Sequence, residues 1–257
     1  MSTEPQTVQS LTRGLAVIRT FGPEHQRQTL AQVAEATGFA RATARRFLHT
    51  LVAEGYAGTD GSLFWLTPKI LELGYSYMAG LGLPAIAQPH LEALSRTVHE
   101  SSSMSVYDQG DVVYVSRVPV RQIMTVSITI GTRLPAHNTS MGRVLLSGLD
   151  DEDLDAYLAS IVPEQFTPTT LTTHDALRSE ITRVAAQGWC IVDQELEIGL
   201  RSLAAPVFSS DNRVVAAINI STQVAKYSLD TLHTTFLPAL IKTAAAISAD
   251  LAASELN

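Results

Sequence analysis

Cysteine is almost absent from this chain of 257 residues, in which Cys190 is the single thiol. One cysteine excludes a disulfide framework and any zinc module that needs several cysteine ligands. Charged residues are also few, at 17%, whereas 46% of the chain is hydrophobic, which is typical of a packed globular protein and excludes disorder as its main state. The length itself predicts two domains.

Segments that would direct the chain to a membrane are lacking as well. No uninterrupted apolar run approaches the roughly 20 residues needed to span a bilayer. Residues 1–6 do not show the basic-then-apolar order of a signal peptide. The sequence therefore predicts a cytoplasmic protein with no membrane partner.

Motifs of catalysis and cofactor binding are also missing. The sequence contains no Gly-x-Ser-x-Gly elbow, phosphate-binding glycine loop, paired-histidine zinc helix or dinucleotide fingerprint. The acidic run 150–155 could suggest a metal, but carboxylates at a predicted helix start are favoured by the helix dipole. Cys190 is most simply a core residue. We expect no enzyme activity, no cofactor and no metal site, and a small-molecule hydrolase in the C-terminal part remains the enzymatic alternative.

Positive charge is scarce, since 18 Lys and Arg stand against 25 Asp and Glu, for a formal net charge of −7. Taken over the whole chain, this charge argues against nucleic acid as a partner. The distribution is uneven, however. Residues 1–69 carry seven basic and five acidic residues, whereas residues 70–257 carry eleven and twenty. Because the acidity belongs to the C-terminal part, a DNA-binding N-terminal part stays open.

The first 68 residues have the pattern of a winged helix-turn-helix. Ser10 is expected to cap a first helix, and Thr29 to cap a second helix that Gly38 terminates. A turn of only three residues leads to a third helix, predicted over residues 41–54. Two helices joined by so short a turn are typical of a helix-turn-helix, whose second helix enters the DNA major groove.

A hairpin and a further helix follow. Residues 56–59 and 62–66 flank Asp60-Gly61, a strong hairpin signal that predicts the wing. Thr67-Pro68 predicts the start of a helix over residues 69–79. The chain is therefore expected to comprise a DNA-binding domain over 8–68, a linker helix over 69–82 and a second domain over 83–257.

The third predicted helix has one apolar face and one polar face. Arginine on the polar face suits guanine or phosphate, because its fork of donors matches paired acceptors. The residues expected to contact double-stranded operator DNA are Arg41, Thr43, Arg45, Arg46, His49 and Thr50. The alternative is a merely solvated helix face, which is the usual meaning of a charge run. The short turn, the wing and the absence of acids over residues 41–53 favour DNA binding.

Residues 83–257 alternate between helices and strands. Helices are predicted near 84–100, 139–147, 151–159, 175–187 and 228–253, and strands near 102–108, 112–118, 123–130, 189–193, 202–208 and 214–220. Short turns between neighbouring strands favour antiparallel pairing. The fold class is therefore α+β, with a largely antiparallel sheet flanked by helices.

Six segments carry a resemblance to a known family: Ser10–Ile18, Leu30–Gly38, Leu66–Gly74, Gly131–Arg143, Gly188–Glu195 and Gly199–Val207. Together and in this order they resemble the IclR family of bacterial transcriptional regulators over nearly the whole chain. The resemblance implies a winged helix-turn-helix, a linker helix and a C-terminal effector-binding domain similar to GAF-type sensors. It also implies a homodimer or homotetramer on operator DNA, with RNA polymerase as an additional partner to consider.

A narrower resemblance rests on Ala44–Leu48, Pro89–Leu94, His99–Ser103 and Thr139–Leu146. These segments are most similar to regulators of the β-ketoadipate pathway, which respond to protocatechuate, 4-hydroxybenzoate or related acids. The resemblance thus implies control by a small aromatic carboxylic acid. The alternative is a different small acid, such as a keto acid.

Effector sites of the family lie between the sheet and a helix N-terminus, where free N–H groups favour a carboxylate. The positions expected to bind the effector are Arg133, His137, Ser140, Met141, Asp193, Glu195 and Ser202. Arg133 would pair with the carboxylate, and His137 or Ser202 would orient a ring hydroxyl. The family often has cysteine where Ser202 stands. Asp193 and Glu195 would repel a carboxylate, and could instead hold Arg133 or accept from a phenol.

Structural alternatives exist for each of these residues. Ser140 or Thr139 could be only a helix cap, Arg133 only a surface partner of Glu195, and His137 only a buried histidine. The linker helix carries a comparable ambiguity. Its apolar positions could form a dimer seam that effector binding re-angles, or they could pack within one subunit; they are Ile70, Leu73, Tyr77 and Met78.

Overall fold

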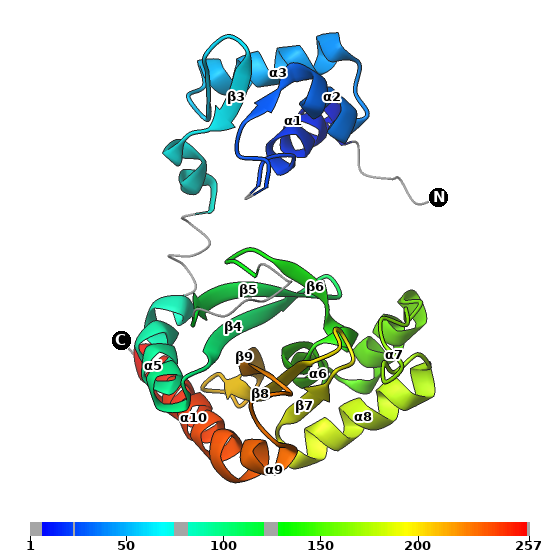
Figure 1. Ribbon diagram of the computed structural model, residues 1–257, viewed down its shortest axis with the longest axis vertical. Helices are drawn as coiled ribbons and strands as arrows, with labels where there is room; N and C mark the ends of the chain where they lie inside the picture. Colours follow the sequence, from blue (N-terminus) through cyan, green and yellow to red (C-terminus); the bar gives the residue numbers. More distant parts are fainter. Residues whose placement is uncertain (1–6, 23, 75–81, 121–127, 256–257) are drawn as a thin grey trace. The chain divides into compact units, whose positions relative to one another are not determined.

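The computed structural model describes residues 7–22, 24–74, 82–120 and 128–255 (Figure 1). The chain divides into two compact units, Met1–Leu81 and Gly82–Asn257. Each unit has a hydrophobic core of its own.

The N-terminal unit is a three-helix cluster with a small sheet. Its helices are α1 (Gln9–Arg19), α2 (Leu30–Thr37) and α3 (Arg41–Ala53), and its strands are β1 (Gln28–Thr29), β2 (Ala57–Thr59) and β3 (Leu63–Leu66). The strand order is β1-β3-β2, so the predicted hairpin gains a third, two-residue strand that the sequence pattern had not indicated. Val17, Val33 and Leu48 form the centre of the core and are completely buried.

The helix ends follow the expected capping chemistry with one exception. The Thr29 hydroxyl accepts a hydrogen bond from the N–H of Gln32, whose side chain bonds back to Thr29 in a capping box. Gly38 ends α2 at φ 69°, in the left-handed region that favours glycine. The prediction for Ser10 is wrong: α1 begins at Gln9 after Val8, without a side-chain cap, so Ser10 lies inside the helix.

The start of the predicted linker helix is a tighter turn than expected. Pro68–Leu71 is a 3₁₀ helix, and residues 72–74 continue in helical conformation. Leu71 and Leu73 are 72% and 56% exposed, so these two residues of the linker segment have little packing within their own unit. The remainder of the predicted helix, including Tyr77 and Met78, lies outside the described residues.

The C-terminal unit confirms the α+β class with a six-stranded antiparallel sheet in the order β6-β5-β4-β9-β8-β7. The strands are β4 (Ser101–Asp108), β5 (Asp111–Val118), β6 (Arg133–Pro135), β7 (Cys190–Asp193), β8 (Leu200–Phe208) and β9 (Val214–Gln223). The helices are α5 (Leu83–Val98), α6 (Ser140–Leu146), α7 (Asp151–Ser160), α8 (His174–Gln187), α9 (Leu229–Thr231) and α10 (Leu237–Glu255).

Two departures from the expected elements occur in this unit. Most of the strand predicted over 123–130 lies outside the described residues, and residues 128–130 are not in a strand; the edge strand is β6 instead. The last helix is interrupted by a π-helical turn at Leu232–Phe236 before α10 begins.

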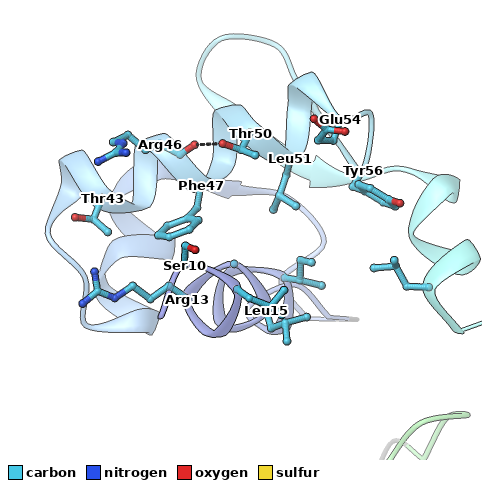
Figure 2. A pocket seen from close by; sticks show the side chains of 14 residues that line it. Ser10, Arg13, Leu15, Thr43, Arg46, Phe47, Thr50, Leu51, Glu54 and Tyr56 are labelled. Carbon is cyan, nitrogen blue, oxygen red and sulfur yellow. Dashed lines mark hydrogen bonds between the residues drawn. The ribbon is translucent and has the colours of Figure 1, made fainter. Parts of the chain in front are cut away.

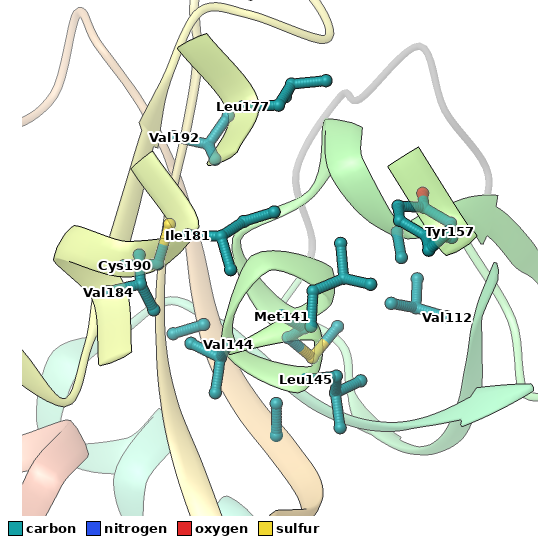
Figure 3. Packing of buried hydrophobic residues seen from close by; sticks show 14 of the residues in the cluster. Val112, Met141, Val144, Leu145, Tyr157, Leu177, Ile181, Val184, Cys190 and Val192 are labelled. Atoms are coloured by element: carbon teal, nitrogen blue, oxygen red, sulfur yellow. The ribbon is translucent and has the colours of Figure 1, made fainter. Parts of the chain in front are cut away.

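Helices cover the sheet on both faces (Figure 1). On one face α5 packs against β4 and β5, and α10 packs against β8, β9 and α5. On the other face α6 packs against β4, β7, β8 and β9, with α8 behind it. The core on this second side contains Met141, Val144, Tyr157, Ile181 and Cys190 (Figure 3). Of the predicted effector residues, Ser140, Met141 and Ser202 lie on the α6 side of the sheet.

One segment of the described residues, Leu229–Ser254, is long and apolar enough to cross a membrane by length and composition. The segment contains Asp230, Lys242 and Asp250, so it is not an uninterrupted apolar run of the kind that the expectation concerned. In the fold, α10 packs against the sheet, and the backbone N–H of Phe208 donates to the Ser248 hydroxyl at 2.9 Å. The apolar residues of this segment therefore take part in covering the sheet.

A glycine lets the first turn of α6 approach the preceding 3₁₀ turn, Ala136–Asn138. A Cβ atom placed on Gly142 would overlap the backbone carbonyl of Ala136. Because backbone cannot move aside as a flexible side chain can, only glycine fits at this position. The close approach fixes Asn138 relative to Ser140.

Replacing this glycine is expected to destabilise the C-terminal unit. Gly142→Ala should lower the free energy of unfolding by about 3 kcal/mol, because overpacking against backbone cannot relax locally. Gly188→Ala is the matched control, since Gly188 has φ 79° and a Cβ atom added there would meet no atom within 4 Å, so backbone strain of about 1 kcal/mol acts alone. Chemical denaturation measures both, and equal losses would contradict the overlap.

Candidate functional site

The N-terminal unit exposes the polar face of α3. Ala44 and Leu48 are buried against the core, whereas Arg41, Arg45, Arg46, His49 and Thr50 are exposed and Thr43 is half-buried. The structure thus brings all six predicted DNA-contacting residues to the accessible side or edge of one helix.

These residues divide between two sides of α3. Arg45 Nε lies 3.5 Å from His49 Nε2, and the His49 ring meets Phe64 of β3 edge-on at 6.0 Å. On the other side Thr43, Arg46 and Thr50 line an open groove between α3 and α1 (Figure 2). Arg13 of α1 lines the same groove and adds a positive charge that the pattern of the third helix alone does not indicate.

The wing is held by a compact set of contacts. The Asp60 carboxylate accepts from the backbone N–H groups of Leu63 and Ser62, which lowers the pKa of Asp60. The Arg27 guanidinium lies over the Trp65 ring at 4.1 Å and 3.7 Å from Asp60. A fixed hairpin with an exposed arginine beside it suits a phosphate-contacting wing.

The C-terminal unit encloses a small cavity between the sheet and the start of α6. Its free volume is about 30 Å³, room for one or two water molecules. Polar groups converge on it: the Ser140 and Ser202 hydroxyls are 2.7 Å apart, and Asn219 Nδ2 donates to Ser202 and Ser221 at 3.1 Å each. The lining residues are Tyr114, Ile128, Leu134, Asn138, Thr139, Ser140, Val192, Leu196, Leu200, Ser202, Asn219 and Ser221.

Two acceptors at this cavity lack partners. Asn138 Oδ1 and Asn219 Oδ1 are buried, and within the described part of the chain neither accepts a hydrogen bond. Each side chain belongs to a residue only 3% exposed. An unsatisfied buried acceptor costs about 1–3 kcal/mol, so both oxygens favour a hydrogen-bond donor in the cavity, which either water or a ligand can supply.

A buried ion pair between Arg143 and Glu195 connects two segments that border the cavity. The Arg143 guanidinium donates to both carboxylate oxygens of Glu195, at 2.7 and 2.6 Å, and its Nε donates to the carbonyl of His137 at 2.9 Å. Arg143 is 1% exposed and Glu195 11%. Burial opposes its charge, but the hydrogen bonds to Glu195 raise the pKa of Arg143. The pair thereby joins the segment before Asn138 to the segment before Leu196.

The structure brings Ser140 and Ser202 together at the cavity, but it places Arg133 and Asp193 elsewhere. Arg133 donates to Asp108 at 2.6 Å and to Asp111 at 3.0 Å on the exposed side of β6. It therefore does not line the cavity, and it does not pair with Glu195. Asp193 forms a two-bond ion pair with Arg201. Their charges are satisfied without a ligand.

The remaining predicted residues have structural partners. Met141 points into the core, where its sulfur accepts from Ser105 (Figure 3). His137 Nδ1 lies 2.8 Å from the Tyr157 hydroxyl, and burial, assisted by Arg143, lowers the pKa of His137 to about 4. His137 is therefore neutral at physiological pH. The Thr139 hydroxyl caps α6 by accepting a hydrogen bond from the N–H of Gly142. This agrees with the alternative that Thr139 is a helix cap.

Several cavity residues are not indicated by the sequence pattern, among them Tyr114, Asn138, Asn219 and Ser221. Asn138 lies directly before the predicted helix and could have been found from that position. Tyr114, Asn219 and Ser221 lie within strands, and only the strand register shows that they face the cavity. Among the described residues, no group of three or more His, Cys, Asp or Glu could hold a metal ion.

Breaking the buried ion pair is expected to lower the free energy of unfolding of the C-terminal unit. Arg143→Met should destabilise the C-terminal unit by about 3–5 kcal/mol, because Glu195 would lose its cation while staying buried. The double variant Arg143→Met/Glu195→Leu should recover at least half of that loss, since an apolar pair needs no counter-charge.

The matched control for this cycle is Arg183→Met. Arg183 is 49% exposed in its pair with Glu180, so its loss should stay within about 1 kcal/mol. Urea denaturation of the single and double variants measures the coupling. Additive effects of Arg143 and Glu195 would show that the pair does not act as a unit.

Comparisons with known proteins find a match for each of the two units. Residues 10–61 match the IclR helix-turn-helix domain, and residues 75–249 match the bacterial transcriptional regulator IclR C-terminal domain. The Pca regulon regulatory protein of Pseudomonas putida is 42% identical over 93% of this chain and 82% of its own length. The p-hydroxybenzoate hydroxylase transcriptional activator of Acinetobacter baylyi is 36% identical over 92% of this chain and 89% of its own.

Solved structures show the same relationship. A transcriptional regulator from Rhodococcus sp. RHA1 superimposes with a TM-score of 0.87 at 57% identity, covering 98% of this chain and 100% of that one. The inducer-binding domain of PobR from Acinetobacter, a double mutant in complex with 3-hydroxybenzoic acid, is 31% identical with a TM-score of 0.60, covering 64% of this chain and 97% of that one. With both of its units matched in order, the chain belongs to the IclR family of bacterial transcriptional regulators.

Proposed function

We propose that this regulator binds operator DNA through α3 and the wing, and that a small aromatic carboxylic acid bound in the C-terminal cavity controls it. The names of the relatives support aromatic-acid catabolism through the β-ketoadipate pathway, since they include regulators of the pca regulon and of p-hydroxybenzoate hydroxylase. All of these relatives are named as regulators, which argues against the hydrolase alternative.

The observation that carries the effector proposal is the pair of unsatisfied oxygens on Asn138 and Asn219. A hydroxybenzoate has a phenolic O–H that donates to such an acceptor, while the apolar lining from Leu134, Val192 and Leu200 matches the chemistry of its ring. A simple keto acid offers only acceptors once it is ionised, so it cannot itself donate to either amide oxygen. The geometry therefore favours a hydroxylated aromatic acid over the keto acid.

The cavity has to enlarge to accept such a ligand. Its free volume of about 30 Å³ is far below the roughly 300 Å³ at the lower end of ligand sites. Arg143 and Glu195 fix the segments around His137 and Leu171, and backbone hydrogen bonds hold Gly199 and Leu200 at the start of β8. The wall that we infer to be displaceable is therefore the stretch 196–198, where Ile198 is 72% exposed. Ligand binding is thus accompanied by an outward movement of this stretch.

The proposal includes the wider organisation of the protein. It comprises a DNA-binding domain at 8–68, a linker helix at 69–82 and an effector-binding domain at 83–257, in a cytoplasmic homodimer or homotetramer. Leu71 and Leu73, exposed in the linker segment, support an apolar contact between subunits there. RNA polymerase is a further partner of the DNA-bound form.

Replacing two arginines of α3 tests the DNA interface. Arg45→Ala combined with Arg46→Ala is expected to weaken specific operator binding by at least about 100-fold, because each lost base or phosphate contact costs about 1–3 kcal/mol. Gel-shift titration at fixed salt, on an operator recovered by selection from a random DNA pool, measures the change. Arg213→Ala, at a 77% exposed side chain of the C-terminal unit, is the control. Wild-type affinity in the double variant would exclude α3 from the interface.

A panel of acids tests the effector class. At a concentration of 100 times Kd, a true effector should stabilise the protein by about 2.7 kcal/mol and raise its melting temperature accordingly. We expect 4-hydroxybenzoate or protocatechuate to give the largest shift and benzoate, which lacks the phenolic donor, a clearly smaller one. Pyruvate and glyoxylate represent the keto-acid alternative. A shift with these and none with hydroxybenzoates would overturn the aromatic assignment.

A further inference from the structure

Arg117 of β5 is a partly buried cation without an acidic partner. Its Nη1 donates to the Ser103 hydroxyl at 3.1 Å, and between residues that the structure describes it takes part in no ion pair. The other arginines near the cavity differ in this respect. Arg143 is paired with Glu195, Arg201 with Asp193, and Arg133 with Asp108 and Asp111.

The strand register places Arg117 on the cavity side of the sheet. Arg117 lies opposite Ser103 across the β4–β5 pair, and Ser103 lies opposite Asn219 across the β4–β9 pair. Residues directly opposite in antiparallel strands share a face, with Cβ atoms about 5 Å apart. Because Asn219 lines the cavity, the guanidinium that contacts Ser103 lies on the same face, beside that wall.

Tyr114 connects this cation to the cavity. Tyr114 lines the cavity and lies within electrostatic range of Arg117. Burial raises the pKa of Tyr114 to about 12, so its hydroxyl keeps its proton and can donate a hydrogen bond. Burial also lowers the pKa of Arg117, which shows the cost of leaving that charge away from water without an anion.

We propose that Arg117 is the cationic anchor for the effector's carboxylate, with the Tyr114 hydroxyl as a second donor. The assignment rests on the proposed function and sharpens it. The carboxylate lies at the β5 side of the cavity, and the phenolic hydroxyl points toward the amide oxygens of Asn138 and Asn219. Arg117 thereby selects an ionised acid over a neutral aromatic compound of the same shape, and it takes the role that the sequence had suggested for Arg133.

The test compares 4-hydroxybenzoate with its neutral analogue 4-hydroxybenzamide by calorimetric titration of the full-length protein. Wild type should bind the acid at least about tenfold more tightly than the amide, because a hydrogen bond to a charged group contributes about 1.5–3 kcal/mol. Arg117→Gln should lose at least about tenfold in affinity for the acid and stay within about threefold for the amide. Arg117→Lys, which keeps the charge, should retain part of the preference.

Two further variants separate this assignment from its competitors. Arg213→Gln, far out on the β8–β9 turn and 77% exposed, controls for a general loss of positive charge and should bind both compounds as wild type does. Arg133→Gln tests the other cation of the region. A loss of acid binding in Arg133→Gln with none in Arg117→Gln would overturn the proposal.

The remaining outcomes are also decisive. If wild type binds the acid and Arg117→Gln binds it equally well, the anchor is wrong while the proposed effector class stands. If wild type binds neither compound, the proposed function fails and the anchor with it. Should Arg117→Gln not fold, the wild-type ratio of acid to amide decides, because equal affinities would mean that no cation selects the carboxylate.

Discussion

The effector-binding unit depends on the buried ion pair between Arg143 and Glu195. One guanidinium on α6 binds a carboxylate from the loop after β7 and the carbonyl of His137, and Glu195 in turn accepts from the N–H of Leu171. Removing two charges from water is costly, and it is offset only when geometry and hydrogen bonding are nearly complete. Three loops that are distant in sequence therefore have one low-energy arrangement, and the cavity lies inside it.

The strand register brings together the polar residues of the sheet that face the cavity, which the ion pair does not position. On the α6 side of the sheet, Ser103 and Asn219 lie directly opposite each other in adjacent strands, with Arg117 next to Ser103. Polar residues at these positions would be unfavourable in an ordinary core, because each must find a partner away from water. Asn138 and Asn219 each have one oxygen to which no described protein group donates. A binding site is the kind of place where such an incomplete polar network is stabilised by its ligand.

The sequence was sufficient for most features that depend on local chemistry, the cap assigned to Ser10 being an exception. The capping residue Thr29, the left-handed Gly38, the three-residue turn and the polar face of α3 follow from rules acting over a few residues, and the structure has all of them. The cavity could be located only by resemblance, and its charges were assigned to wrong partners. Arg133 and Glu195 were considered as partners of each other, yet Arg133 pairs with Asp108 and Asp111, and Glu195 with Arg143. Which carboxylate meets which arginine depends on strand register, and no local pattern encodes it.

A closed cavity also bears on how an effector can act. A ligand shifts a conformational equilibrium only by the difference in its affinity for two states. With about 30 Å³ free, the cavity as described is too small for a hydroxybenzoate, so under the proposed function this arrangement is the state of low affinity. Under the proposed function the free energy of binding must therefore exceed the cost of moving the wall at 196–198, and that movement is what the rest of the protein would detect. The ion pair matters here too, because it keeps the opposite wall fixed and so directs the displacement into one loop.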